Sequence, residues 1–298
     1  MSQQGIATTP KGLIIALTAF LIWGNFPLYF KLLSGYNAVE IIAHRVIWTF
    51  LLLLGLMVVA RRWVWVAKVK QNPKWLVLTF VAALLIGTNW LVYVWAVTHN
   101  QVLEASLGYF IHPLVGVALS MLVFKEKLRI LQKIAVSLAL LAVAMQIIWL
   151  GGLPWVSLAL PLSFAFYGVI QRYTPFDAVD GLFIEIALLM PLCVLWLCFA
   201  GVASSSLSLW VSSEIWLLAL AGPITLVPLL LYNISTKLVQ FNTLSFLNYL
   251  TPSIVFLLAV FYYHEPIDGQ RLMIFGLIWA GLAIFSMDMV KHRKRAAQ

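Results

Sequence analysis

Three ionisable side chains, Glu40, His44 and Arg45, lie close together inside one apolar stretch, with Trp48 one turn further on. On a helix, Glu40, His44 and Trp48 share one face at intervals of four residues, and Arg45 lies one residue around. Burying an ionisable side chain in a membrane costs at least ~2.5 kcal/mol, so such a residue is a functional candidate by default. A guanidinium binds carboxylates and other electron-rich groups. We therefore predict ligand binding by Arg45 and His44; an ion-paired cluster that only anchors the helix end is the alternative.

Aromatic residues with polar ends, and amides beside them, recur on helical faces of other apolar stretches. Asn89, Trp90 and Tyr93 lie at positions i, i+1 and i+4 of one such stretch. Their rings suit an organic ligand and their polar ends need a partner, whereas small residues such as Ser106 and Gly116 indicate close helix packing. The predicted lining of a ligand cavity is Asn89, Trp90, Tyr93, Tyr109, Tyr167, Asn248 and Tyr249, together with Arg45 and His44.

The acidic residues of the apolar stretches are expected near helix ends rather than at mid-depth. All of these acids fall within about two turns of an end: Glu104, Glu126, Glu185, Glu265 and Asp288. Proton-coupled pumps commonly relay protons through buried acids or histidines. Without an acid at the midplane, the sequence favours facilitated diffusion or exchange, and His44 is the expected proton site.

The sequence shows no spacing typical of a metal, nucleotide or disulfide site. Cys193 and Cys198 share one apolar stretch and lie on different helical faces, and no phosphate-binding loop occurs. We predict no catalytic residues, no metal and no cofactor.

The chain that carries these residues is too apolar for a water-soluble fold. Its 298 residues are 63% hydrophobic and 10% charged, and the mean hydropathy is +0.99. Soluble domains are nearer half apolar and a quarter charged. One crossing of a bilayer needs ~20 apolar residues in a helix. The predicted fold is all-α and integral to the membrane, with ten spans at residues 12–33, 40–60, 75–97, 105–124, 134–150, 156–172, 181–203, 214–236, 245–263 and 272–290.

The basic residues predict the orientation of these spans. The net charge is +9, and all but Lys31, Arg45 and Arg271 of the 19 Lys and Arg residues fall in segments on one side of the membrane. Positive residues accumulate on the cytoplasmic side of membrane proteins. We predict a bacterial inner-membrane protein with both termini in the cytoplasm. Its partners are membrane lipids and a small-molecule substrate, not nucleic acid, and the sequence leaves a monomer and a homodimer open.

The fourth and ninth spans share a pattern that predicts an internal repeat. Pro113 aligns with Pro252, and neighbouring identities follow without a gap. Five spans form each half, an odd number, so the second half must enter the membrane upside down, as in many secondary transporters. Residues 1–150 and 151–298 are thus predicted as two inverted five-helix repeats of one transmembrane domain. Chance similarity between two apolar helices is the alternative.

Charged residues at span ends and the two aligned prolines are predicted to act in gating or in structure. Lys31 is a natural partner for Glu40, and Glu126 aligns with Glu265 in the repeat. Prolines at matched depth loosen the backbone, which suits discontinuous helices and gating.

Six segments carry a resemblance to a known family: WGNFPLYFKLL (23–33), EIIAHRVIW (40–48), NWLVYVWAV (89–97), EASLGYFIHPLVGVALSMLVFKEKL (104–128), SFAFYG (163–168) and TPSIVFLLAVFYYHEP (251–266). In this order they resemble the RarD-type, chloramphenicol-sensitivity transporters of the EamA branch of the drug/metabolite transporter superfamily, over essentially the whole chain. The resemblance implies two inverted five-helix halves around a central cavity that opens to one side at a time. Two departures are Lys125, where similar proteins often carry Gly, and Asn248, where they often carry Gln.

The predicted function is secondary transport of a small organic metabolite or drug, amino-acid-like or aromatic, across the inner membrane by alternating access. The alternative is an intramembrane lipid-modifying transferase that uses Glu40, His44 and Arg45, although no second cluster of His, Asp or Glu faces them. A structural or regulatory subunit is a third class, and it would not need ionisable residues inside its second span. The sequence leaves the substrate, the direction and the coupling ion open.

Overall fold

The structure is a computed structural model that describes residues 8–33, 35–98, 102–150, 155–201, 215–262 and 269–296. In these ranges every regular element is a helix. The helices are α1 (Pro10–Gly24), α2 (Phe26–Leu32), α3 (Ala38–Val59), α4 (Val64–Gln71), α5 (Lys74–Thr98), α6 (Val102–Phe124), α7 (Ile130–Leu150), α8 (Trp155–Tyr173), α9 (Ala178–Phe199), α11 (Ile215–Thr236), α12 (Phe241–Leu247), α13 (Leu250–Phe261) and α14 (Gly269–Ala296).

Among the described residues, eight helical stretches are long and apolar enough to cross a membrane. They correspond to α1–α2, α3, α5, α7, α9, α11, α12–α13 and α14. The fourth and sixth predicted spans fall on α6 and α8. The apolar stretch identified in α6, Gly108–Phe124, is shorter, and Gln171 and Arg172 lower the hydropathy of α8. The protein is therefore an all-helical membrane protein with eight candidate spans by this criterion.

Two of the spans are broken helices. α1 gives way to α2 at Asn25, where Pro27 sits in the first turn of the new helix and has no N–H to continue the ladder. α12 gives way to α13 at Asn248 and Tyr249, with Pro252 in the first turn of α13. The ninth span is thus discontinuous, whereas α6 in the fourth span runs through Pro113 as one helix.

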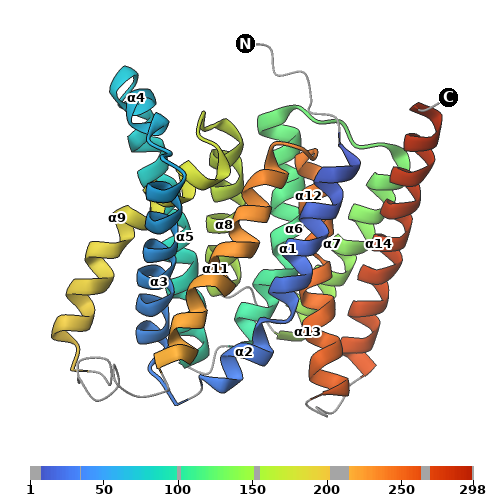
Figure 1. Ribbon diagram of the computed structural model, residues 1–298. Helices are drawn as coiled ribbons and strands as arrows, with labels where there is room; N and C mark the ends of the chain where they lie inside the picture. The colour runs from blue at the N-terminus through green and yellow to red at the C-terminus, as the bar shows by residue number, and fades with distance from the viewer. Residues whose placement is uncertain are drawn as a thin grey trace.

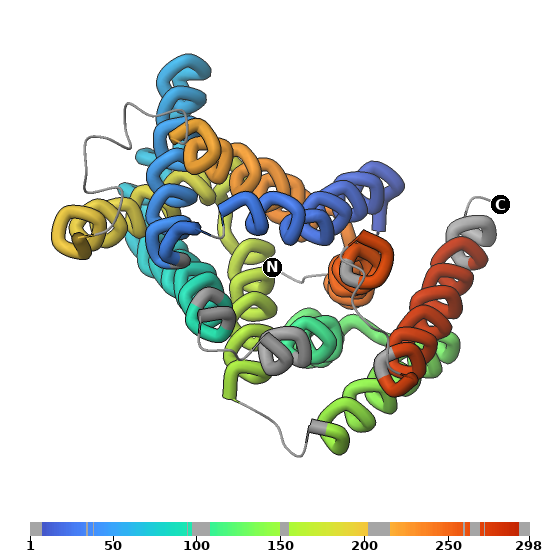
Figure 2. The backbone as a smooth tube through the Cα atoms, turned by 90° about the horizontal axis from the view of Figure 1, so that it is seen from below, coloured from blue at the N-terminus to red at the C-terminus, as the bar shows by residue number. Residues whose placement is uncertain are grey.

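The helices form one bundle with a peripheral pair (Figures 1 and 2). α3 packs on α9 and α11, α5 on α8 and α9, and α6 on α8 and α12. The main partners of α1 are α11 and α13, which come much later in the chain. Figure 2 shows α7 and α14 lying against each other at one edge of the bundle.

One end of the bundle collects most of the basic residues, and we call it the basic end. The start of α1, the short helix α4 and the end of α14 all lie there (Figure 1). Cross-contacts join its segments: Thr9 donates from its N–H to the Leu238 carbonyl at 3.0 Å, and Lys68 donates to the Pro175 carbonyl at 3.0 Å. The grouping agrees with the charge asymmetry of the sequence.

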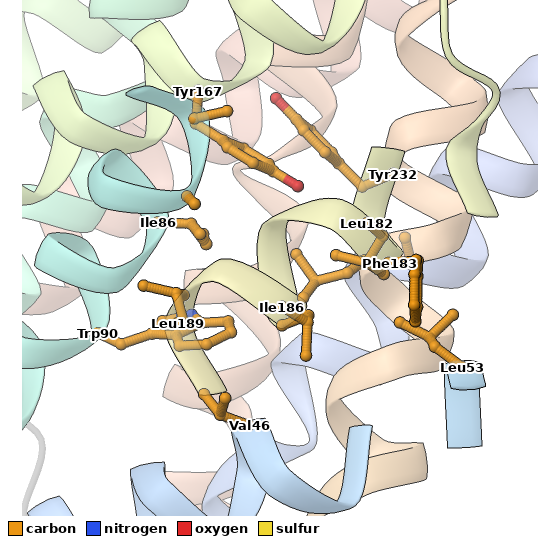
Figure 3. Packing of buried hydrophobic residues seen from close by; sticks show 14 of the residues in the cluster. Val46, Leu53, Ile86, Trp90, Tyr167, Leu182, Phe183, Ile186, Leu189 and Tyr232 are labelled. Atoms are coloured by element: carbon orange, nitrogen blue, oxygen red, sulfur yellow. The ribbon is translucent and has the colours of Figure 1, made fainter. Parts of the chain in front are cut away.

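Small residues let the helices approach closely. Gly222 of α11 lies against α3, where an added Cβ would come within 2.8 Å of the Trp48 Cβ. Gly116 of α6 lies directly against the side chain of Ser245 in α12, and Ser120 is fully buried. These positions confirm that small residues on helical stripes mark packing. The largest buried cluster, which joins α1, α3, α5, α9 and α11, is shown in Figure 3.

Candidate functional site

Arg45 is held inside the bundle by the way α3 begins. The Asn37 side chain caps the helix by accepting a hydrogen bond from the Val39 N–H at 2.9 Å. Eight residues further on, Arg45 lies ~12 Å along the helix, since each residue rises 1.5 Å. Its side chain is buried, with a relative exposure of 7%, and its Nε donates to the Thr225 Oγ1 of α11 at 2.9 Å.

Aromatic rings surround the Arg45 guanidinium. Its Cζ lies 4.7 Å from the centroid of the Trp90 ring and 5.5 Å from that of Phe30. Such cation–π contacts contribute roughly 0.5–2 kcal/mol each. Tyr93 and Tyr109 lie within electrostatic reach of the same charge. None of the four ion pairs among the residues that the structure describes involves Arg45, so rings and a hydroxyl stabilise its charge there.

Tyr93 and Tyr109 mark the open side of this group. Their rings meet edge to face with centroids 5.9 Å apart, yet Tyr109 keeps 38% of its surface exposed. This part of Tyr109 is therefore not covered by the helices that the structure describes. We call Arg45, Phe30, Trp90, Tyr93 and Tyr109 the Arg45 site. Four helices, α2, α3, α5 and α6, supply its side chains, and α11 supplies Thr225.

The other ionisable residues of the second span have partners of their own. His44 is fully buried and accepts a hydrogen bond at Nδ1 from the Trp48 Nε1 at 3.2 Å. Glu40 is also buried and lies within electrostatic reach of His44. Lys31 is exposed at the end of α2. The expected cluster is thus partly assembled, with Arg45 facing rings and His44 bonded to its own helix.

The remaining predicted lining residues lie in contacts between helices. Asn89 donates to the Leu160 carbonyl at 2.8 Å and to the Ser163 Oγ at 3.0 Å, and so joins α5 to α8. The Tyr249 hydroxyl donates to the Phe110 carbonyl at 3.1 Å. Asn248 bonds to the ring of His112, a buried histidine that the sequence analysis did not single out. The structure does not bring these three predicted residues to the Arg45 site.

Tyr167 belongs to a separate polar network around Glu185 of α9. Glu185 has a relative exposure of 1%. Its Oε2 accepts from the Tyr167 hydroxyl at 3.2 Å, its Oε1 accepts from the Gln171 amide, and Tyr167 also contacts Asn233 of α11. Glu185, which was expected near a helix end, is thus a buried acid with neutral hydrogen-bond partners. An acid alone in the apolar stretch 181–203 was the available signal.

Ion pairs tie the two halves of the chain together at the basic end. Glu126 accepts from the backbone N–H groups of Phe241 and Asn242, each at 2.9 Å, and pairs with Arg172 at 3.0 Å. The Arg172 guanidinium also lies 4.3 Å from the centroid of the Phe124 ring. Glu126 therefore fastens the end of α6 to α8 and to the start of α12. Its predicted repeat partner, Glu265, lies outside the described residues.

Further contacts close the same end. Arg62 pairs with Asp177 and, at 3.2 Å, with Asp180 at the start of α9. Arg129 pairs with Asp288 and so joins α7 to α14. Lys237 donates to the carbonyls of Thr174 and Phe176, and burial lowers the pKa of its ammonium group. At the basic end, charged side chains thus join segments that are distant in the sequence.

Comparison with known proteins places the chain in a family. Residues 10–148 match the model of the EamA-like transporter family, and residues 151–287 match it a second time. The chain belongs to the EamA-like transporter family. An uncharacterized transporter of Pseudomonas aeruginosa is 45% identical over 294 residues, which cover 98% of each chain. The protein RarD of Escherichia coli K12 is 39% identical over 291 residues, 97% of this chain and 98% of its own length.

More distant relatives agree with this placement. The chloramphenicol-sensitive protein RarD of Pseudomonas aeruginosa is 28% identical and matches over 97% of each chain. A solved crystal structure shares the fold, with a TM-score of 0.66 and 22% identity over 94% of this chain and 98% of the other. The protein is therefore a RarD-type EamA membrane transporter and not an enzyme, and the transferase alternative is not favoured.

Proposed function

We propose that this EamA transporter is a secondary transporter that moves a small organic molecule across the bacterial inner membrane by alternating access. The Arg45 site is proposed to hold the substrate. The observation that carries this proposal is a buried guanidinium, without a carboxylate partner among the described residues, beside the exposed face of Tyr109. A guanidinium has five N–H donors, and the Nε–H is the one that bonds to Thr225.

The chemistry of the site suggests what the substrate carries. The free donors of Arg45 suit a carboxylate or another electron-rich group, which they can bind in a two-pronged geometry. The rings of Trp90, Tyr93 and Phe30 suit a flat or apolar body of aromatic size. An amino-acid-like or aromatic metabolite or drug combines both features. Asn89, Asn248 and Tyr249 lie away from this site, and their proposed role is to hold the helices around it in place. His44 keeps a proposed role beside Arg45 on α3.

Ten spans in two inverted halves fit this mechanism. The family model matches twice, over 10–148 and 151–287. The packing also supports two equivalent halves. The contact of α6 with α8 has its counterpart in the contact of α13 with α1, and the contact of α5 with α8 has its counterpart in that of α11 with α1. In Figure 1, α1 and α8, the first helices of the halves, run in opposite directions. We propose residues 1–150 and 151–298 as the two repeats, with Arg45 near their interface.

The basic end is proposed as the cytoplasmic side and as a closed gate. The pair of Glu126 with Arg172 crosses from the first half to the second, and its side chains are buried, 2% and 4% exposed. Removing one partner of a buried pair leaves an uncompensated charge. Opening this side therefore requires Glu126 to break its contacts with α8 and with α12 at the same time.

Replacing Arg45 tests the proposed substrate contact. Arg45→Lys keeps the charge but loses the planar donors, and Arg45→Ala loses both. We expect both variants to insert normally, with uptake reduced roughly tenfold for Lys and roughly a hundredfold for Ala, since charged hydrogen bonds contribute about 1.5–3 kcal/mol. Uptake is measured in reconstituted vesicles with labelled amino acids and labelled chloramphenicol, per folded molecule.

Arg61→Lys is the matched control, because Arg61 is an exposed residue just beyond the same helix. If Arg45 only anchors α3, Arg45→Lys should transport like the unchanged protein and Arg45→Ala should lower the amount of folded protein. Unchanged uptake per folded molecule in both Arg45 variants would refute the binding role.

A further inference from the structure

The buried carboxyl group of Glu185 is not used by the proposed substrate site. Glu185 lies in α9, eight residues after the capping residue Asp177, or ~12 Å along the helix. Its hydrogen-bond partners are the neutral side chains of Tyr167 and Gln171 on α8. A buried acid with neutral partners inside a membrane helix is a candidate for carrying protons.

The network around Glu185 allows two proton arrangements without moving a heavy atom far. The Tyr167 hydroxyl lies 3.2 Å from Glu185 Oε2, and it also lies 3.0 Å from the Nδ2 and 3.2 Å from the Oδ1 of Asn233. In one arrangement Tyr167 accepts from Asn233 and donates to a Glu185 carboxylate. In the other, a protonated Glu185 donates to Tyr167, which donates to Asn233 Oδ1. The Tyr167 hydroxyl can therefore reorient when Glu185 gains or loses a proton.

The helices packed around this network bring few other charges to it. Positions 46–59 of α3 and 75–92 of α5 contain no titratable residue. α11 contributes Tyr232, whose ring stacks on Tyr167 at 6.4 Å between centroids, as Figure 3 shows. The remaining titratable groups of α8 and α9 lie further along: Arg172 pairs with Glu126, Tyr173 stacks on Phe124, and Asp180 pairs with Arg62. Cys193 and Cys198 lie about two and between three and four turns beyond Glu185. No cation of the described residues lies within 4.0 Å of Glu185.

Glu185 is the counterpart of Arg45 in the other half. α3 opens with Asn37-Ala-Val-Glu40, and α9 opens with Asp177-Ala-Val-Asp180. Both caps accept a hydrogen bond from the N–H two residues later, at 2.9 and 3.0 Å. Arg45 and Glu185 are each the eighth residue after the cap, on helices that pack against each other. Equivalent positions thus hold a cation in one half and an acid in the other.

We propose that Glu185 is a proton-binding site that couples substrate movement at Arg45 to the proton gradient. The proposal rests on the proposed transport function. A proton from water at one face forms an O–H bond at Glu185 Oε2 as Tyr167 redirects its own proton to Asn233. The proton returns to water on the other face when the gate has changed sides. An anionic substrate and one proton then cross together without net charge.

The first test reads the proton directly and needs no substrate. Infrared difference spectra of the purified protein, recorded as the pH is changed, show the carbonyl band of a protonated carboxylic acid. We expect a pH-dependent band that is absent in Glu185→Gln and shifted in Tyr167→Phe, which removes its partner. Asp288→Asn is the matched control, because it removes a buried carboxyl that pairs with Arg129; the band should remain.

The second test reads coupling. Vesicles with an imposed difference of one pH unit support up to about tenfold accumulation of a substrate that moves with one proton, because a unit corresponds to about 1.4 kcal/mol. Glu185→Gln should lose this accumulation and keep exchange of labelled amino acids or chloramphenicol at equal pH. Accumulation equal to that of the unchanged protein, or a band that survives Glu185→Gln, would overturn the proposal. Failure of the unchanged protein to move any probe would count against the proposed function instead, and the infrared band would still decide the proton site.

Discussion

At the scale of single residues, the role of a buried charged side chain depends on the chemistry of its neighbours. Arg45 and Glu126 are both buried. Glu126 has a cation and two backbone N–H groups as partners, so it serves as a fastening. Arg45 has rings and one hydroxyl beside it, and we propose that its remaining donors bind the substrate.

Lys125 offers a test of backbone strain at this scale. Its φ is +54°, in the left-handed region that favours glycine. Lys125→Gly should raise the free energy of unfolding by about 1 kcal/mol, because a side chain costs 1–2 kcal/mol in that conformation. Thermal unfolding in detergent measures the change. Lys127→Gly, in the same loop but without a positive φ, should not stabilise; equal behaviour of the two variants would contradict this account.

The residues of the Arg45 site are easier to single out from the sequence than the network around Glu185. An ionisable residue inside an apolar stretch, such as Arg45, can be recognised from the sequence alone. Glu185 lies about one turn from a predicted span end, and its hydrogen-bond network depends on Tyr167 and Asn233 in other helices. Asn89 and Tyr249 were placed in the lining for their chemistry, yet backbone carbonyls of neighbouring helices bind them. Such contacts depend on rotation between helices, which one sequence does not reveal.

At the scale of helices, close packing of α11 on α3 positions the Arg45 site. Gly222 lies one turn before Thr225 and directly against Trp48, and Thr49 donates to the Gly222 carbonyl at 3.2 Å. This contact sets the distance between Thr225 and Arg45.

Gly222→Ala should force α3 and α11 apart. The new Cβ would lie 2.9 Å from the Trp48 carbonyl carbon, and the backbone there cannot turn away as a flexible side chain could. We expect a loss of roughly 1–3 kcal/mol in stability, the usual cost of overpacking, measured as thermal unfolding, together with reduced uptake. Gly55→Ala is the matched control on α3, because open space surrounds Gly55. A normal melting temperature in Gly222→Ala would show that the helices tolerate the separation.

At the scale of the whole molecule, charge and helix order together predict topology. The lengths of the apolar stretches were sufficient to place helices at all ten predicted ranges, because a bilayer imposes a minimum length. They could not reveal that the first span breaks at Asn25 or that α6 stays whole through Pro113, since neighbouring helices decide whether a proline interrupts a span.

Reporter fusions test the orientation. Fusions after Pro73 and after Lys291, both at the basic end, should report the cytoplasm, because positive residues are retained there. A fusion after Gly201, at the far end of α9, should report the periplasm and serves as the control. A periplasmic signal from either of the first two fusions would overturn the topology.

The packing of α1 has a consequence for the order in which the protein can be assembled. α1 is synthesised before α11 and α13, on which it mainly packs, and its capping residue Thr9 bonds to Leu238, 229 positions later. It must therefore reside in the bilayer without its main partners until α11 and α13 have been made. The apolar residues of the span Pro10–Leu32 make lipid a suitable temporary neighbour. The packing around α1 is thus completed only after α11 and α13 have been synthesised and inserted.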